Sequence, residues 1–228
     1  MRGTLNKLKL QRMKLVIQLV LWIVIVFLGY LVFNSIYEPI QFNKVKEKRY
    51  AKVIENLKDI RDAELAHRTI TGRFEGNWDS LVAFIDTAQF TLTQRRDSTV
   101  LDEEYVKTYG VDKYKEIVIT DTLGYRSVKD SLFKNSNRYK TMMNVPIKGV
   151  NAKFELDAGT IDKNGTQIPV FEAKVAKAVV LNDQDRDLIL QENEMVSVDN
   201  VNGAFISVGS MEEVNTSGNW PLKYGDAE

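Results

Sequence analysis

The sequence predicts an α+β protein with an N-terminal transmembrane helix, a helical stem and an extracytoplasmic domain built on antiparallel strands. A run of 23 uncharged residues separates Lys14 from Glu38. A strongly helical segment without Gly or Pro follows at 46–70. Alternating apolar and polar residues come only in the second half, and helices followed by antiparallel strands are typical of α+β domains. The expected boundaries are 1–14 for a basic stub, 15–37 for the transmembrane helix, 38–72 for the stem and 73–228 for the domain.

Composition excludes several classes of site. The 228 residues include 31 Lys+Arg, 31 Asp+Glu, one His and no Cys. A zero net charge argues against nucleic-acid binding, which needs a basic surplus to neutralise phosphates. The lack of Cys excludes disulfides, thiolate zinc sites, iron–sulfur clusters and Cys nucleophiles. We therefore expect no nucleic-acid partner, no cofactor and no metal.

The uncharged run is long enough to cross a membrane. At about 1.5 Å per residue it forms a helix of roughly 34 Å, against a hydrocarbon core of roughly 30 Å. A cleaved signal peptide has a shorter apolar region and a small-residue cleavage site, whereas the first alanine here is Ala51. A core helix of a soluble protein is rarely apolar on every face over such a length. We predict an uncleaved signal anchor, with these residues in the membrane: Leu15, Trp22, Phe27, Tyr30 and Phe33.

Charge is segregated around this helix. Five basic residues and no acid precede it, which leaves 26 basic and 31 acidic residues in the remainder. The positive-inside rule places the N-terminus in the cytoplasm and the acidic remainder outside, in the periplasm of a double-membrane bacterium. An exported domain without disulfides must be held by its core, for which its length suffices. The residues that set the topology are Arg2, Lys7, Lys9, Arg12 and Lys14.

A helical stem follows the membrane segment. We expect the membrane helix to end or kink at Pro39, because proline lacks a backbone donor. We expect the stem helix to end at Gly72, in the C-cap position. Apolar residues in a 3-4-3 spacing form a stripe, which packs either against the chain's own domain or against a partner helix. This stem stripe is the predicted interaction surface, and it consists of Tyr50, Val53, Leu57 and Ile60.

The rest of the chain is expected to form short helices and two hairpins. Turn residues at 121–124 and at 162–165 each lie between strand-like runs. Pro169 indicates an edge or the start of a strand. In chain order we expect a helix at 79–87 with Asp79 near its N-cap, an irregular polar segment at 89–114 with a helical turn at 101–109, hairpins at 117–128 and 154–175, a helix at 183–193 and a strand at 204–208.

Two groups of residues could carry chemistry. His67 follows Glu64 by three residues, and a carboxylate–imidazole pair could do acid–base work. Such pairs are common on solvated helix faces, so we expect a structural role and no catalytic residue. A second group resembles the start of a calcium loop, but Leu188 stands where that loop needs Gly, and helix capping is the favoured role. The aspartates of this group are Asp183, Asp185 and Asp187.

The segment 59–74 resembles type IV pilins and pseudopilins, in which a long N-terminal helix ends in a Gly-Arg/Lys-aromatic sequence, here Gly72-Arg73-Phe74. The Gly218-Asn219-Trp220 sequence near the end is also similar to the major pseudopilin of type II secretion. The resemblance implies a pilin-like domain. Pilins carry a peptidase site before the apolar segment and a Glu just inside it, and the apolar segment here has no Glu.

The whole chain also resembles a set of uncharacterised single-pass membrane proteins of Bacteroidota. Residues 38–44, 59–74 and 170–174 and the Gly-Asn-Trp end carry this resemblance. It implies a membrane protein and no particular activity.

Together these observations predict a non-enzymatic envelope protein anchored in the inner membrane. It would act by protein–protein contact, as a pseudopilin-like or scaffold component of a secretion or pilus-type assembly. Its expected partners are the membrane and other envelope proteins or a second copy, through the stem. A membrane-tethered periplasmic sensor or ligand-binding module is the alternative. An enzyme that uses carboxylates from distant loops also stays open, because one sequence does not reveal such pairs.

Overall fold

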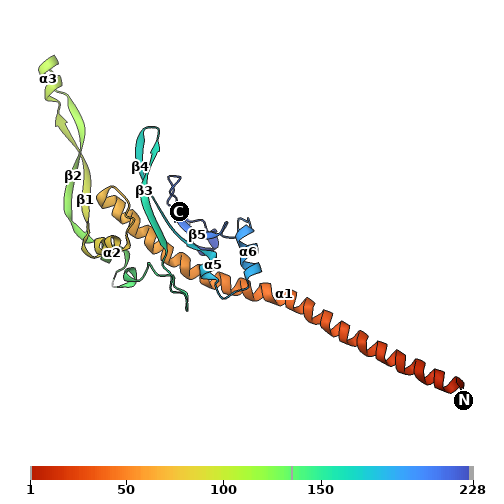
Figure 1. Cartoon of the computed structure of the whole chain (residues 1–228). Coiled ribbons are helices and arrows are strands. Elements are labelled where there is room, and N and C mark those ends of the chain that lie inside the picture. Colours follow the sequence, from red (N-terminus) through yellow and green to blue (C-terminus); the bar gives the residue numbers. More distant parts are fainter. Residues whose placement is uncertain (1, 135, 226–228) are drawn as a thin grey trace.

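The structure, a computed structural model, describes residues 2–134 and 136–225, with the backbone alone for 2–13. It is α+β, as predicted, with a long apolar N-terminal helix and antiparallel sheets (Figure 1). The elements are α1 (Arg2–Thr71), α2 (Trp78–Thr87), β1 (Gln89–Leu101), α3 (Glu103–Tyr109), β2 (Tyr114–Ser127), α4 (Val128–Leu132), η1 (Arg138–Lys140), β3 (Glu155–Lys163), β4 (Thr166–Ala176), α5 (Lys177–Val180), α6 (Arg186–Glu194), β5 (Phe205–Gly209) and η2 (Leu222–Tyr224).

Helix α1 is continuous over 70 residues and has two different halves. It runs through Pro39, so of the two outcomes expected there, an end or a kink, the end was wrong. Burial against the domain begins at Phe42, and this packing holds the turns that follow the proline. The helix ends as predicted at Gly72, whose φ of 80° is left-handed and whose N–H donates to the carbonyl of Arg68 at 2.8 Å. Its N-terminal half extends away from the rest of the molecule (Figure 1).

A three-stranded antiparallel sheet, in the order β3-β4-β5, lies along the C-terminal half of α1 (Figure 1). The predicted hairpin is confirmed: β3 and β4 are joined by Asn164 and Gly165, which both have positive φ, as a two-residue primed turn requires. Pro169 lies in the central strand, but β5 pairs only with 172–176. The N–H group that Pro169 lacks is therefore missing from a part of β4 that pairs with β3 alone.

The core lies between this sheet and α1. On β4, Phe171, Ala173 and Val175 alternate with Glu172 and Lys174. The first three are at most 4% exposed and belong to the same core cluster as the stem stripe. Glu172 and Lys174 form an ion pair on the other face. One face of the sheet thus covers the helix and the other faces solvent, which is common in antiparallel sheets.

The segment 89–127 forms a long two-stranded hairpin with α3 at its tip, which we call the arm (Figure 1). The expectation of an irregular segment at 89–114 was therefore wrong. So was the separate hairpin at 117–128, because that stretch is one strand. The supposed turn contains a bulge: Leu92 pairs with Gly124 and Thr93 with Thr122, so Leu123 has no partner. The arm has no buried face, so its strands lack the alternation that would have revealed them.

The remaining helices start close to their predicted positions. Asn77, and not Asp79, caps α2: its side chain accepts hydrogen bonds from the N–H groups of Asp79 and Ser80. Helix α6 begins at Arg186, within the predicted range, and β5 matches the predicted last strand within one residue.

Candidate functional site

The N-terminal half of α1 presents an uncovered apolar surface. Trp22, Phe27 and Tyr30 are 58–62% exposed, and no part of the most apolar stretch is buried. By length and composition this helix is able to cross a membrane. Of the predicted topology residues, Lys14 is exposed. The side chains of the other four lie outside the described residues: Arg2, Lys7, Lys9 and Arg12.

The stem stripe is covered by the chain's own domain. Tyr50, Val53, Leu57 and Ile60 are 0–1% exposed and pack in the main core cluster. Of the two uses left open for this stripe, the structure therefore shows packing within the fold. A partner helix has no access to these four side chains, so any contact with another protein uses other surfaces.

A buried group of charges joins α1 to α5 and α6, the two helices between β4 and β5. Lys46, Lys177 and Glu192 are at most 5% exposed. The Lys46 Nζ atom donates to Glu192 Oε2 at 2.8 Å, and Lys177 Nζ lies 3.5 Å from Glu192 Oε1. Lys177 also donates to the carbonyl oxygens of Glu192 and Val201, at 3.0 and 2.7 Å. One carboxylate and two carbonyls thus compensate two buried ammonium groups.

The burial of this group shifts its acid–base equilibria. Desolvation lowers the pKa of Lys177, while the charge of Glu192 opposes that shift. Desolvation, followed by the charge of Glu192, raises the pKa of the neighbouring Tyr50 hydroxyl. Sequence reasoning missed these residues because Lys46 stands in a Lys- and Glu-rich helical segment, where lysines are normally solvated.

The three aspartates whose sequence resembles the start of a calcium loop have separate structural roles. The two carboxylate oxygens of Asp183 accept hydrogen bonds from Arg49 at 2.6 and 2.7 Å, which lowers the pKa of that carboxyl. Asp185 caps α6 by accepting from the N–H groups of Asp187 and Leu188. Asp187 lies exposed in the first turn of α6. Within the part of the chain that the structure describes, no three His, Asp or Glu side chains form a metal-binding group.

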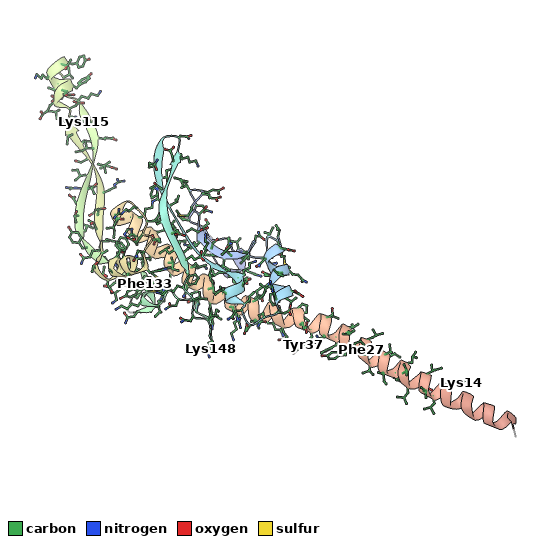
Figure 2. All side chains as sticks on the ribbon, in the orientation of Figure 1. Lys14, Phe27, Tyr37, Lys115, Phe133 and Lys148 are labelled. Carbon is green, nitrogen blue, oxygen red and sulfur yellow. The ribbon has the colours of Figure 1, made fainter. Side chains whose placement is uncertain are left out.

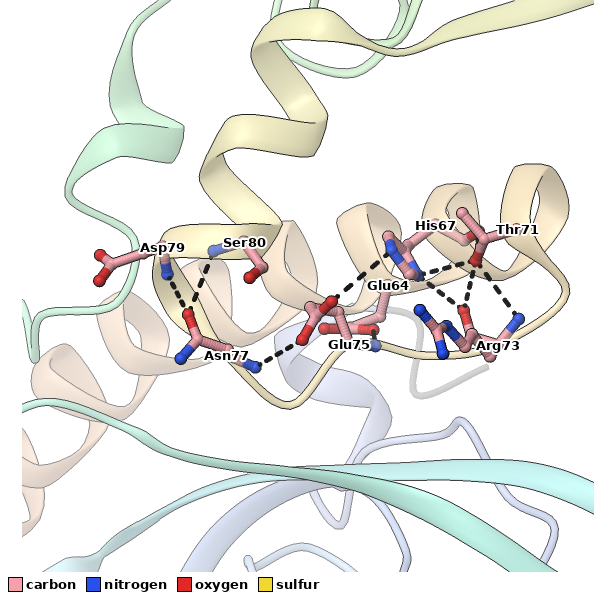
Figure 3. Close-up of polar contacts among 8 residues, drawn as sticks. All are labelled: Glu64, His67, Thr71, Arg73, Glu75, Asn77, Asp79 and Ser80. Atoms are coloured by element: carbon pink, nitrogen blue, oxygen red, sulfur yellow. Dashed lines mark hydrogen bonds and ion pairs between the residues drawn. The ribbon is translucent and has the colours of Figure 1, made fainter.

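Glu64 and His67 lie together in a polar cluster at the end of α1 (Figure 3). Both are buried, with exposed fractions of 0% and 6%. The His67 Nδ1 atom lies 2.7 Å from the carbonyl oxygen of Arg73, and because a carbonyl only accepts, Nδ1 carries the proton. The Glu64 Oε2 atom accepts from the N–H of Glu75 at 2.9 Å. These hydrogen bonds fix the backbone of the connection between α1 and α2, so Glu64 and His67 have a structural role.

The pKa of the Glu64 carboxyl is strongly raised. Burial raises its pKa from 4.5 to about 8, against the opposing effect of the hydrogen bond from Glu75. Its other oxygen, Oε1, has no hydrogen-bond partner among the described residues. At neutral pH the buried group is therefore mainly protonated and uncharged.

A basic hollow lies beside the exposed edge of the stem. Its volume is about 270 Å³. Lys48, Lys52 and Lys148 line it without an ion pair to any described residue, and Arg49 lines it while paired to Asp183. The remaining lining residues are Val45, Pro146 and Ile147.

Outside α1, the arm carries the most exposed large apolar side chains apart from Val196, Val198 and Leu222. Val118, Leu123 and Tyr125 of β2 are 60–68% exposed, and Tyr109 of α3 and Tyr114 are comparable. Side chains project from both faces of the ribbon along its length (Figure 2). Sequence reasoning missed this surface because it predicted a short hairpin at 117–128 and did not recognise β1 or the full length of β2.

Comparison with protein-family models, with curated proteins and with solved structures found no match.

Replacing Glu192 by Gln should destabilise the fold. The change leaves Lys46 and Lys177 buried without a carboxylate, and breaking a buried pair on one side typically costs about 3–5 kcal/mol. We expect the free energy of unfolding of the full chain in micelles, measured with urea and Trp fluorescence, to fall by about 3 kcal/mol. Glu194→Gln, on the exposed side of α6, is the matched control and should change it by less than about 0.5 kcal/mol. Equal effects of the two changes would contradict this assignment.

Stability should also depend on the titration of Glu64. Below pH 4.5 the carboxyl is protonated in both states, and its contribution is complete. As pH rises from 4.5 to 8 the unfolded state loses its proton before the folded state, so stability falls, by about 1.4 kcal/mol for each pKa unit of difference. Glu64→Gln should remove this component from unfolding measured between pH 4.5 and 8.5. Glu55→Gln, at an exposed position of α1, should retain it, and an unchanged pH dependence in Glu64→Gln would contradict the assignment.

Proposed function

We propose that the protein is a non-enzymatic envelope protein, anchored in the inner membrane with a cytoplasmic N-terminus, that acts by protein–protein contact. The supporting observation is α1 itself. One continuous helix has an uncovered apolar half and a second half enclosed by an α+β domain. A helix of this kind couples the domain to the membrane without a flexible linker.

A pseudopilin-like or scaffold role in a secretion or pilus-type assembly fits this arrangement best. In support, a long N-terminal helix packs by its C-terminal half on an antiparallel sheet, as in the pilin plan that segment 59–74 resembles. The polar clusters that sequence reasoning selected as candidate chemistry have structural partners: Asp183 binds Arg49, and Glu64 and His67 hold the α1–α2 connection. Contact surfaces therefore carry the proposed function.

Photo-crosslinking in intact membranes tests this proposal. A photoreactive amino acid at exposed positions of the stem (Lys52, Glu55) and of the arm (Leu123) should give products heavier than the monomer. The same amino acid at Val53, which is adjacent to Lys52 but buried, should give only the monomer. Monomer alone from every exposed position would contradict a function by protein–protein contact.

A ligand-binding module is the second candidate function, and the basic hollow favours it. Three lysines without ion pairs suit a small multivalent anion. Pyrophosphate should then raise the unfolding temperature of the full chain in micelles by a few degrees. The double change Lys48→Gln and Lys52→Gln should abolish this shift, whereas Lys107→Gln on the arm should preserve it. No shift in the unchanged protein would rule out this candidate for phosphate anions.

A further inference from the structure

The outer edge of β2 is open. The arm is a two-stranded sheet, so β2 pairs with β1 on one side and with no other strand of the described chain. Figure 1 shows the arm standing away from the body, with no element lying along it. Isolated two-stranded ribbons are marginally stable, and an open edge is a template for pairing with another strand.

The segment of β2 able to pair regularly is well defined. The bulge at Leu123 interrupts the strand on the side of the body, and the strand begins at Tyr114 on the side of the tip. Between them lie Tyr114–Thr122, and the middle residue of this segment is Val118. A strand of this length exceeds the common five to six residues, and Ile117-Val118-Ile119 has the β-branched composition that strands favour.

We propose that the partner of this edge is a second copy of the chain, paired antiparallel through β2 around a twofold axis at Val118. The proposal rests on the function by protein–protein contact and names its partner. The two arms would form a four-stranded sheet. Because the bulge-free segment is centred on Val118, this register uses the whole of it in both copies.

The same register matches side chains across the interface. Ile117 lies opposite Ile119 of the second copy, and Lys115 lies opposite Asp121, each pair occurring twice by symmetry. Within the arm Asp121 already pairs with Arg96 at 3.0 Å, and Lys115 Nζ lies 4.0 Å from Asp102. The Lys115 and Asp121 side chains are still 55% and 49% exposed, so a second strand would add a further partner to each. Apolar and opposite-charge pairs directly across an antiparallel sheet are the favourable ones.

Two alternatives are less favourable: a shifted register of the β2–β2 pair, and self-pairing through the open edge of β1. A shift of two residues places Ile119 opposite Lys115 in one direction, and Ile117 opposite Asp121 in the other. On β1, the bulge-free part is Thr93–Leu101, with Asp97 in the middle. Pairing β1 with itself about this residue would oppose two aspartates, and like charges directly opposite destabilise a sheet.

Cysteine crosslinking tests the position of the twofold axis. The chain has no Cys, so within this protein an introduced cysteine can form a disulfide only with its copy in a second chain. Directly opposite residues in antiparallel strands have Cα atoms about 4.5–5.5 Å apart, which a disulfide spans. Val118→Cys in the full chain, oxidised in membranes and in micelles, should give a disulfide-linked dimer as its main product. Asp97→Cys is the matched control, since Asp97 pairs with Val118 inside the hairpin but lies on the other strand, and it should remain monomeric. Crosslinking no stronger for Val118→Cys than for Asp97→Cys would overturn the proposal.

Charge reversal tests the register. Adding Lys115→Asp to Val118→Cys opposes acids on both sides of the axis and should reduce crosslinking about tenfold. Mixing this variant with Asp121→Lys in the same background should restore it, because the carboxylates of one copy then face ammonium groups of the other at both positions. Undiminished crosslinking with Lys115→Asp would overturn the register. If Val118→Cys fails while the stem photo-crosslinks capture a different protein, the second-copy assignment falls and the proposed function stands.

Discussion

The apolar face of α1 is the surface on which the domain is assembled. The strands β4 and β5 and the helices α2 and α4 all contact this helix. Burial of one large aliphatic side chain contributes about 1.5–3 kcal/mol, and the stem stripe provides several such side chains. Phe171 and Ile206 on the sheet are fully buried and belong to the same core cluster as the stem stripe of α1. Domain and stem therefore fold as one unit, and the direction of the apolar half of α1 follows from that packing.

Polar contacts at both ends of the packed segment of α1 specify its register more strongly than the apolar stripe does. An apolar stripe with a 3-4 spacing looks similar after a shift of one helical turn, so it specifies register weakly. Buried polar groups, by contrast, have one set of partners: Lys46 binds Glu192 of α6, and Glu64 accepts from the N–H of Glu75 in the connection that follows α1. A shift of α1 by one turn would separate Lys46 from Glu192 and leave both buried charges unpaired, at a cost of several kcal/mol.

The arm differs physically from the rest of the domain. It has no hydrophobic core, and its strands stabilise each other only by their ladder and by pairs of side chains such as Arg96 with Asp121. A second copy on β2 would double the number of strands and cover part of Ile117, Val118 and Ile119. In this proposal stem and arm have separate roles, since α1 would join the domain to the membrane while the arm would reach a second copy.

Much of the fold was predictable because it depends on local patterns. The uncharged run predicted the apolar half of α1, Gly72 predicted its end, and the alternation around Asn164-Gly165 predicted the β3–β4 hairpin. Pro39 was misleading, because packing that starts at Phe42 outweighs one missing hydrogen bond. The arm was missed since strands without a buried face carry no alternation.

By itself the sequence determined which segments are apolar on all faces, on one face or on none, because that property belongs to the residues and their spacing. It left open what covers the stem stripe, since a sheet and a partner helix require the same pattern. Only the tertiary structure decided this, by placing β4 and β5 on the stripe. It also decided that Lys46, Glu64 and Glu192 are buried. Lys46 and Glu192 are 146 residues apart in the chain, so no local sequence pattern predicts that they form a pair.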